Sequence, residues 1–307
     1  MSLSRRAFLS GTTGFVASAA LSSVPTLAHS EMMLGNIQLD VVSDGSLTLP
    51  GSFIFETMPK DALAPILNKH NLSADVLEPP INVTLMRHGA RTVLFDVGSG
   101  SDFAPNSGML LQSLDALGVA PEDITDVVFT HAHPDHLWGL LDDFDDLLFT
   151  EATYQIGQVE WDYWMNPNTV DTIGDARASF AVGAKRRLDV IADNINLFND
   201  GDEILPGVAA RATFGHTPGH MAFEVRQGAQ AAMILGDCIG NHHVAFEKPE
   251  WESGSDQDAE TAAQTRLRLL DQLAHEKTLI IGYHLIGNGI GYVDKSTSGF
   301  TFVAEDT

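Results

Sequence analysis

The segment THAHPDHLWGL, residues 130–140, places three histidines and one aspartate within six consecutive positions. It begins where the apolar run VVF at 127–129 ends, and the length and β-branched content of that run predict a buried strand. Functional side chains are typical of such strand ends, where a loop leaves a rigid sheet. Because successive side chains alternate in an extended segment, we expect His131 and His133 to share one face.

The second half of this segment turns away from the strand direction. Pro134 ends the strand, so that Asp135 and His136 can approach the same space from a different angle. We therefore expect this segment to supply ligands to two metal positions that lie close together. A polar surface loop is the ordinary alternative, but four ligand-type side chains at this spacing directly after a buried strand favour metal binding.

Three later apolar runs also end close to a candidate ligand. His216 comes shortly after AARATF, Asp237 follows AAMILG, and His284 follows TLIIGY. A carboxylate has two oxygens and can bridge two cations, and imidazole is a favoured ligand for borderline metals such as zinc. Taken alone, Asp237 would more often be a capping residue and His284 a hydrogen-bonded core histidine. Only the combination with segment 130–140 makes them candidate ligands.

The composition limits the kinds of partner and the kinds of metal site. The chain has 307 residues, of which 44% are hydrophobic, so it can bury a substantial core. Its formal net charge is −24, and such a surface repels nucleic acid and anionic membrane surfaces. Cys238 is the single cysteine, which excludes an intramolecular disulfide and a cysteine-rich zinc site. Any metal must therefore be held by histidines and carboxylates.

Residues 1–28 have the pattern of a twin-arginine export signal. Arg5 and Arg6 precede a weakly apolar run rich in small residues, and Thr26 and Ala28 suit signal cleavage. A membrane anchor is the alternative, but the many Ser, Thr and Gly residues of the run disfavour it. We therefore expect a periplasmic or secreted protein without a stable membrane anchor, in which residues 29–307 form a single domain.

Short strand-like runs alternate with helical patterns along the rest of the chain. Strands are predicted at 37–43, 81–87, 91–97, 126–130, 221–227, 231–236 and 278–282, and helices at 108–118, 172–194 and 255–277. The short HGA connection between the second and third strands predicts a hairpin. We expect Ser255 to cap the last helix, and its Arg266 to face solvent. The alternation predicts layered α/β structure in which helices cover sheet faces.

The ligand pattern resembles that of the metallo-β-lactamase superfamily over nearly the whole of the chain after the signal. It consists of His-x-His-x-Asp-His at 131–136, followed by His216, Asp237 and His284. The resemblance implies an αββα sandwich, with the metals at one edge of the paired sheets. It also suggests a homodimer.

Three segments narrow the resemblance within that superfamily. They are FGHTPGH at 214–220, LGDCIGNHHVAF at 235–246 and IGYHLIGNGIGY at 281–292. They look most similar to the methyl parathion hydrolase and aromatic-lactone hydrolase group, and more distantly to N-acyl homoserine lactonases. This subgroup implies that the substrate is a lactone or an aryl ester, with phosphotriesterase activity as a secondary reaction.

The resemblance also assigns the ligands and the chemistry. It places one metal on His131, His133 and His216, the other on Asp135, His136 and His284, and makes Asp237 the bridge. Two divalent cations are implied, zinc in first place, with manganese, cobalt and iron left open. They would lower the pKa of a bridging water, supply hydroxide near neutral pH and polarise the carbonyl or phosphoryl oxygen under attack. Asp135 would orient that hydroxide and then accept its proton.

The surroundings of the bridging aspartate and the aromatic residues bear on the substrate. Acyl homoserine lactonases typically carry a tyrosine shortly after that aspartate, but here Asp237 is followed by Cys238, Ile239 and Gly240, which weakens a quorum-signal assignment. The methyl parathion hydrolase group lines its leaving-group pocket with aromatic residues. The candidates in this chain are Phe103, Trp161, Trp164 and Phe180. Ordinary core packing is an equal alternative for each of them.

Other functions remain open from the sequence. A β-lactamase or a glyoxalase-like thioesterase of the same fold uses similar ligands, although the latter needs basic residues for a glutathione carboxylate and this acidic chain offers few. A metal-binding module without turnover is the non-enzyme alternative, and the presence of Asp135 disfavours it. We expect a structural role for His220, because seven ligands already complete the site.

Overall fold

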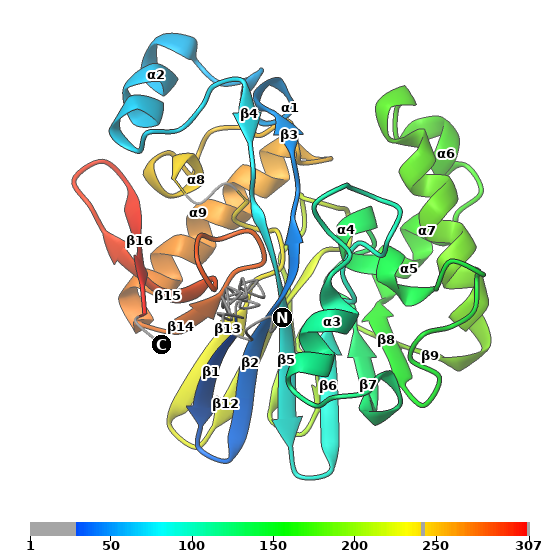
Figure 1. The fold of residues 1–307 in the computed structure, drawn as a ribbon. Helices are drawn as coiled ribbons and strands as arrows, with labels where there is room; N and C mark the ends of the chain where they lie inside the picture. The colour runs from blue at the N-terminus through cyan, green and yellow to red at the C-terminus, as the bar shows by residue number, and fades with distance from the viewer. Residues whose placement is uncertain (1–28, 241–242, 306–307) are drawn as a thin grey trace, which may run out of the picture.

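The computed structural model of the chain describes residues 29–240 and 243–305 (Figure 1). The expected export signal, 1–28, lies outside these residues and stays a prediction. Within the described ranges, no helix is both long enough and apolar enough to cross a membrane.

Two seven-stranded sheets lie face to face at the centre of the molecule (Figure 1). The first has the order β1 (His29–Leu34), β2 (Ile37–Ser46), β5 (Pro80–His88), β6 (Arg91–Phe95), β7 (Asp126–Val128), β8 (Thr153–Gly157) and β9 (Ile195–Phe198). The second has the order β10 (Glu203–Leu205), β11 (Val208–Ala212), β12 (Met221–Gln227), β13 (Gln230–Ile234), β14 (Leu279–Ile281), β15 (Ile290–Lys295) and β16 (Phe300–Ala304). Strands β6 to β9 are parallel, as are β13 and β14, so the carboxyl ends of each set share one edge.

Helices cover the outer faces of both sheets. Helices α3 (Leu110–Ala116), α5 (Gln158–Met165) and α7 (Ala178–Ile191) pack on the first sheet, and α9 (Ala259–Glu276) packs on the second. Between the sheets, the rings of Phe95 and Phe223 lie 5.3 Å apart in a continuous apolar core. This order of helix, sheet, sheet and helix confirms the expected αββα sandwich.

The predicted strands are all present, with ends that differ by a few residues. The expected hairpin is the antiparallel pair of β5 and β6, in which Thr84 lies opposite Phe95. Short strands such as β9, β10 and β16 were not predicted. Their three to five residues are partly exposed at or near sheet edges, and so short a run carries little periodicity.

Two expectations about α9 were wrong. Its N-cap is Asp258, whose carboxylate accepts the backbone N–H of Thr261 at 3.1 Å, whereas Ser255 lies in a turn before the helix. The prediction that Arg266 faces solvent was wrong, because its side chain is 2% exposed and donates to two backbone carbonyls of segment 249–256. Periodicity identifies a polar helix face, but it does not show which other segment packs over that face.

An insert of residues 47–79 stands beyond the strand ends (Figure 1). It contains β3 (Leu49–Pro50), α1 (Gly51–Phe55), α2 (Lys60–Lys69) and β4 (Val76–Leu77). Its own apolar cluster includes Ile54, Phe55 and Ile66, and it extends to Val244 of α8 (Val244–Glu247). No helix was predicted here, since Pro65 lies inside α2 and interrupts the pattern.

A second raised part, formed by α6 (Thr169–Thr172) and α7, faces the insert across the strand ends (Figure 1). Short 3-10 helices are also present: η1 (Pro121–Asp123), η2 (Trp138–Leu140), η3 (Asp175–Arg177) and η4 (Ala192–Asn194).

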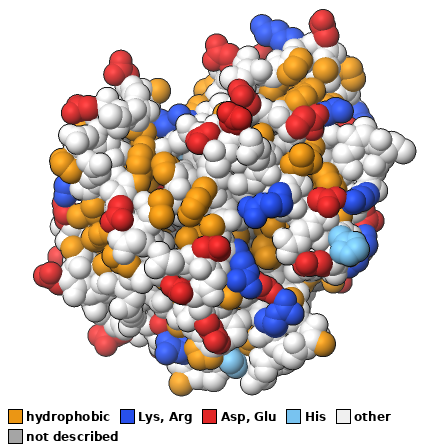
Figure 2. Space-filling model, turned by 180° about the vertical axis from the view of Figure 1, so that it is seen from behind, with side chains coloured by type: hydrophobic (Ala, Val, Ile, Leu, Met, Phe, Trp, Pro, Cys, Tyr) orange, Lys and Arg blue, Asp and Glu red, His pale blue; other side chains and the backbone are white. Residues whose placement is uncertain are grey.

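Seen from behind, basic, acidic and hydrophobic side chains are interspersed over the surface (Figure 2).

Candidate metal centre

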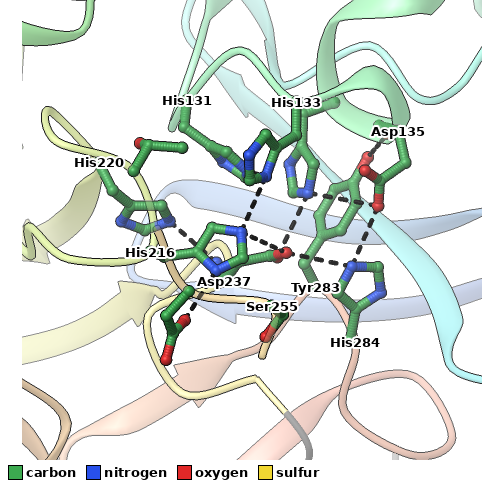
Figure 3. Close-up of polar contacts among 12 residues, drawn as sticks. His131, His133, Asp135, His216, His220, Asp237, Ser255, Tyr283 and His284 are labelled. Carbon is green, nitrogen blue, oxygen red and sulfur yellow. Dashed lines mark hydrogen bonds and ion pairs between the residues drawn. The ribbon is translucent and has the colours of Figure 1, made fainter. Parts of the chain in front are cut away.

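Three histidine rings meet beyond the carboxyl end of β7. His131 and His133 lie in the loop after β7, and His216 lies between β11 and β12 of the other sheet. Nε2 of His131 is 3.0 Å from Nδ1 of His133, which is 2.9 Å from Nε2 of His216. All three side chains are buried, and they form one set of candidate metal ligands, the three-histidine group (Figure 3).

A second set, the aspartate–histidine group, lies beside the first. Asp135 and His136 belong to α4 (Pro134–Leu137), Asp237 follows β13, and His284 follows β14. Nε2 of His284 is 3.1 Å from Oδ2 of Asp135 and 3.3 Å from Oδ2 of Asp237. The same Asp237 oxygen is 3.4 Å from Nε2 of His216, so this carboxylate contacts both groups. The structure thus brings all seven candidate ligands together.

Buried acceptors orient the rings of His131 and His136. Asp96 follows β6, and its Oδ2 accepts the hydroxyl of Thr130 at 2.7 Å and Nδ1 of His136 at 2.8 Å. Because Thr130 gives its hydrogen to Asp96, its oxygen accepts from Nδ1 of His131 at 3.0 Å. Both rings therefore carry a proton at Nδ1, on the outside, and aim Nε2 at the centre, where a bound cation would use the Nε2 lone pair.

His216 and His284 are oriented in the same way. Nδ1 of His216 donates to Oδ1 of Asp256 at 3.0 Å, and Nδ1 of His284 donates to the carbonyl of Pro80 at 2.7 Å. The other oxygen of Asp256 is 3.3 Å from a guanidinium nitrogen of Arg266, so a buried ion pair supports the His216 ring. These rings, too, present Nε2 to the centre.

The ligand set fits divalent cations. Within the described residues, Nε2 of His136 and Oδ1 of Asp237 are buried without a hydrogen-bond partner, although they lie 3.3 Å apart. His133 is turned so that Nδ1 faces the centre while Nε2 contacts the side-chain amide of Gln257 at 3.0 Å. A cation would use these inward lone pairs, and sets of histidine and carboxylate ligands are typical of zinc and related metals.

The two groups differ in their protonation. Burial, together with the neighbouring rings, lowers the pKa of His131 and His133 well below 6.5, so these rings are neutral. Burial also lowers the pKa of His136, but the surrounding carboxylates, Asp237 first, raise it to about 10. The aspartate–histidine group therefore favours positive charge strongly, and bound cations would supply that charge.

The Asp237 backbone is held from behind by His220. Nε2 of His220 accepts the backbone N–H of Asp237 at 2.9 Å, and Nδ1 contacts the hydroxyl of Thr213 at 2.8 Å. Gly236 has a φ of +54°, and a Cβ there would lie 2.7 Å from Nε2 of His220, so this position requires glycine. Cys238 is buried, and burial raises the pKa of its thiol to about 12. Both His220 and Cys238 lie outside the two ligand groups.

A cavity of about 310 Å³ opens onto the two groups. The apolar side chains that the insert contributes to its wall are Leu47, Leu49, Phe53, Ile54, Leu72, Leu77 and Pro79. Phe103 and Phe180, whose ring centroids are 6.2 Å apart, also line it, together with Arg177. Mainly apolar walls around a few convergent polar groups are typical of small-molecule sites.

The four aromatic candidates occupy different places. Phe103 and Phe180 line the cavity, and the ring of Phe180 is 6.0 Å from that of His133. Trp164 is 1% exposed and packs against His133 with a centroid distance of 5.9 Å. Trp161 packs against the core of the first sheet. Two of the four candidates therefore reach the cavity wall.

Several residues that support the centre were not identified from the sequence. Asp96 lay inside the predicted strand 91–97, whereas the structure ends β6 at Phe95 and places Asp96 directly after it. Asp256 is 40 residues from His216, and no sequence pattern connects the two. The apolar wall of the insert was missed for the same reason, since only the packed fold brings it over the ligands.

Residues 77–284 match the family described as the metallo-beta-lactamase superfamily. The chain belongs to this superfamily. Metallo-beta-lactamase domain-containing protein 1 of Xenopus laevis is 31% identical over 139 residues, which make up 45% of this chain. The aligned part spans about half of that relative, 54% of its length. Superfamily membership and the buried ligand set together support a metal-dependent hydrolase.

Solved structures share the fold over most of the chain. AidC, a dizinc quorum-quenching lactonase in complex with the product N-hexanoyl-L-homoserine, is 24% identical with a TM-score of 0.86, covering 92% of this chain and 98% of its own. The hydrolase AbOPH of the beta lactamase superfamily is 24% identical with a TM-score of 0.84 and the same coverage. A probable metal-dependent hydrolase from Staphylococcus aureus is 19% identical, with a TM-score of 0.71 and coverages of 90% and 99%. At these identities the likeness shows the fold.

Proposed function

We propose that this protein is a two-metal hydrolase that opens lactones or aryl esters carrying an apolar substituent. The observation that carries the proposal is the placement of two largely buried groups of candidate ligands, both contacted by Asp237, beside a cavity with mainly apolar walls. The similar structure of AidC supports the lactone class, because that protein is a lactonase in complex with a product.

The two groups would hold one cation each, with zinc as the proposed metal. His131, His133 and His216 would hold the first, and Asp135, His136 and His284 the second, while Asp237 contacts both positions. When bound, two divalent cations polarise a scissile carbonyl and lower the pKa of water. The hydrogen bonds at the outer nitrogens keep the rings aimed at the cations, so little reorganisation is needed on binding.

Asp135 is the residue proposed to accept a proton during the reaction. Its side chain lines the cavity, and its backbone carbonyl accepts the hydroxyl of Tyr283 at 2.7 Å. The Tyr283 ring in turn stacks on His136 at 3.8 Å, which fixes this part of α4. Burial raises the pKa of Asp135, but His136 and His284 outweigh burial and lower it. The carboxylate is therefore ionised and able to act as a base.

The cavity walls suggest where the two halves of a substrate would lie. The Phe180 ring is 6.0 Å from that of His133, and the Phe103 ring is 6.2 Å from that of Phe180, so an aromatic leaving group would pack against this pair near the ligands. The apolar side chains of the insert would bury an acyl or alkyl substituent. An aryl phosphotriester would use the same surfaces, which makes phosphotriester hydrolysis the proposed secondary activity.

The cavity lining bears on the alternative functions, a glyoxalase-like thioesterase or a β-lactamase of the same fold. Arg177 is the only Lys or Arg among the described residues that line the cavity, and it donates to the carbonyls of Gly254 and Ser255 at 2.7 and 3.1 Å. A glutathione thioester carries carboxylates that need cationic partners. This wall therefore favours a neutral substrate over a glutathione thioester.

The first test compares initial hydrolysis rates on dihydrocoumarin, an aromatic lactone, and on a dimethyl aryl phosphotriester, each with and without chelator. We expect fast, chelator-sensitive opening of the lactone and slow turnover of the phosphotriester. If neither is hydrolysed while two metals are bound, the substrate class is wrong, and thioesters and β-lactams come next. A protein that binds metals and hydrolyses none of these would be a binding module.

The proposed location is the periplasm or the exterior, with residues 1–28 as a twin-arginine signal. Replacing Arg5 and Arg6 by lysine should retain the protein in the cytoplasm in cell fractionation. Export that continues unchanged would contradict this. The proposed homodimer is tested separately by the mass measured in light scattering.

A further inference from the structure

Glu160, in the first turn of α5, is a buried carboxylate whose oxygens have four hydrogen-bond donors. Oε1 accepts the backbone N–H of Ala132 at 2.9 Å and the indole N–H of Trp164 at 2.6 Å. Oε2 accepts the hydroxyl of Thr217 at 2.7 Å and the backbone N–H of Gly219 at 3.0 Å. The side chain is 0% exposed, so these four bonds take the place of water.

The donors come from both sides of the three-histidine group. Ala132 lies between His131 and His133 in the loop after β7, and Thr217 directly follows His216 in the loop of the second sheet. One carboxylate thus joins the two loops, at positions one residue from each of the three ligands. Neither loop can shift relative to the other without breaking a hydrogen bond to a buried charge.

The backbone packing between α5 and the His216 loop is equally close. A Cβ on Gly219 would lie 2.1 Å from the backbone nitrogen of Glu160, so the helix can approach this loop only because the residue is glycine. Trp164, one turn further along α5, packs its ring against His133. The helix therefore supports the three-histidine group through both polar and apolar contacts.

We propose that Glu160 is a positioning residue that sets the spacing of His131, His133 and His216, and thereby the affinity of the metal position they form; this rests on the proposed two-metal function. In the aspartate–histidine group the outer ring nitrogens are bonded to Asp96 and Pro80 instead. Loss of the Glu160 carboxylate should therefore weaken one metal position and spare the other.

Glu160→Gln is the decisive variant because it keeps the shape and changes only the hydrogen bonding. Each Glu160 oxygen accepts two hydrogen bonds, but a glutamine side chain has only one acceptor oxygen. The two donor groups on the other side would therefore face the NH₂ of the amide, which is itself a donor. Asp44→Asn is the matched control. Asp44 is also a 0% exposed carboxylate, and it accepts from Ser99 and Leu110 rather than from either ligand loop.

The experiment measures zinc stoichiometry and the affinity of each position by chelator competition, together with the visible absorption of the Co²⁺-substituted protein. In Glu160→Gln we expect one position to bind about 10- to 100-fold more weakly, the other to be unchanged, and the Co²⁺ spectrum of the weakened position to differ. Asp44→Asn should resemble the wild type. Unchanged affinities in Glu160→Gln, equal weakening of both positions, or the same selective loss in Asp44→Asn would overturn the proposal.

Thr217→Val keeps the test decisive if Glu160→Gln does not fold. It removes one donor and leaves the carboxylate and its three other bonds. We expect a smaller, severalfold loss at the same position, and wild-type affinity at both positions would contradict the proposal. None of these measurements uses hydrolysis. A wild type that binds two zinc ions but cleaves no ester would overturn the proposed function alone.

Discussion

The candidate metal centre and the 47–79 insert border the same cavity but are built in opposite ways. The candidate ligands come from the ends of strands in two sheets, and their outer ring nitrogens contact buried groups such as Asp96 and Asp256. The insert has a separate apolar cluster, and its side chains form the cavity wall. Among its polar contacts with the rest of the chain are those of Thr57 with Glu252 and of Ile54 with Gly254.

This difference in construction assigns reactivity to the candidate metal centre and substrate selectivity to the insert. A metal site needs fixed distances, so its residues belong on rigid sheet edges where each side chain is hydrogen-bonded. A wall that buries an apolar substituent needs only shape and surface, which a separately packed insert can change without moving the ligands. Substitutions in the centre should therefore affect rate and metal affinity, whereas substitutions in the insert should affect substrate preference.

The largest effect is expected for Asp135→Asn. Asparagine keeps the size and an oxygen but cannot accept the proton, so kcat/KM should fall by about 10²- to 10⁴-fold on any hydrolysed ester. Steady-state kinetics on the metal-loaded variant provide the measurement, with metal content determined in the same sample. Activity within a few fold of the wild type, with both metals bound, would remove Asp135 from the proposed role.

A smaller effect within the same region is expected for Asp256→Asn. The Asp256 carboxylate accepts a hydrogen bond from Nδ1 of His216. Asparagine is an uncharged and weaker acceptor, so metal binding should weaken by about 10- to 100-fold. Activity should recover when zinc is added in excess. Asp258→Asn is the control, because Asp258 caps α9 only two residues away and contacts no ligand in the described structure. Equal metal affinities in the two variants would contradict the role of Asp256.

Phe53→Ala should separate the two regions. Phe53 lines the cavity from the insert, so its truncation should raise KM for a lactone with a long apolar substituent by about tenfold and leave kcat nearly unchanged. A lactone without that substituent should be unaffected. Val182→Ala, an exposed position on α7 outside the cavity lining, is the control. Loss of metal or of kcat in Phe53→Ala would show that the insert also supports the centre.

The smallest effect is expected where the insert is tied to α8. Lys69 of α2 and His70 contact the carboxylate of Glu247 at 2.6 and 2.5 Å. Burial raises the pKa of Glu247, but these two partners outweigh it and lower the pKa. The contact therefore stabilises the fold above the ordinary pKa of a glutamate, and the stabilisation is lost as the pH falls through the lowered folded value.

Glu247→Gln should accordingly lower the free energy of unfolding by about 0.5 kcal/mol near neutral pH, since the contact is partly exposed. The difference in unfolding free energy between the variant and the wild type should shrink as the pH falls through the lowered pKa of Glu247. Denaturant unfolding at several pH values measures this. A difference that grows in acid would have the wrong sign for the assigned contact.

The sequence identified the candidate ligands because they come after apolar runs that themselves have the pattern of a strand. The VVF run before His131 and the AAMILG run before Asp237 are local signals, readable over a few residues. Capping of α9 was less readable, since Ser255 and Asp258 are both acceptable N-cap residues and packing chose between them. Arg266 was misjudged because its partners belong to segment 249–256, not to its own helix.

The sequence by itself therefore determined the chemistry available: which imidazoles and carboxylates stand at strand ends, and that no cysteine ligand set exists. Only the tertiary structure decided that Glu160 joins two ligand loops and that the insert forms part of a cavity wall. The physical reason is the distance along the chain between the residues that determine each feature. Strand ends follow from local periodicity, whereas these contacts depend on how two sheets and their helices pack, which no short segment encodes.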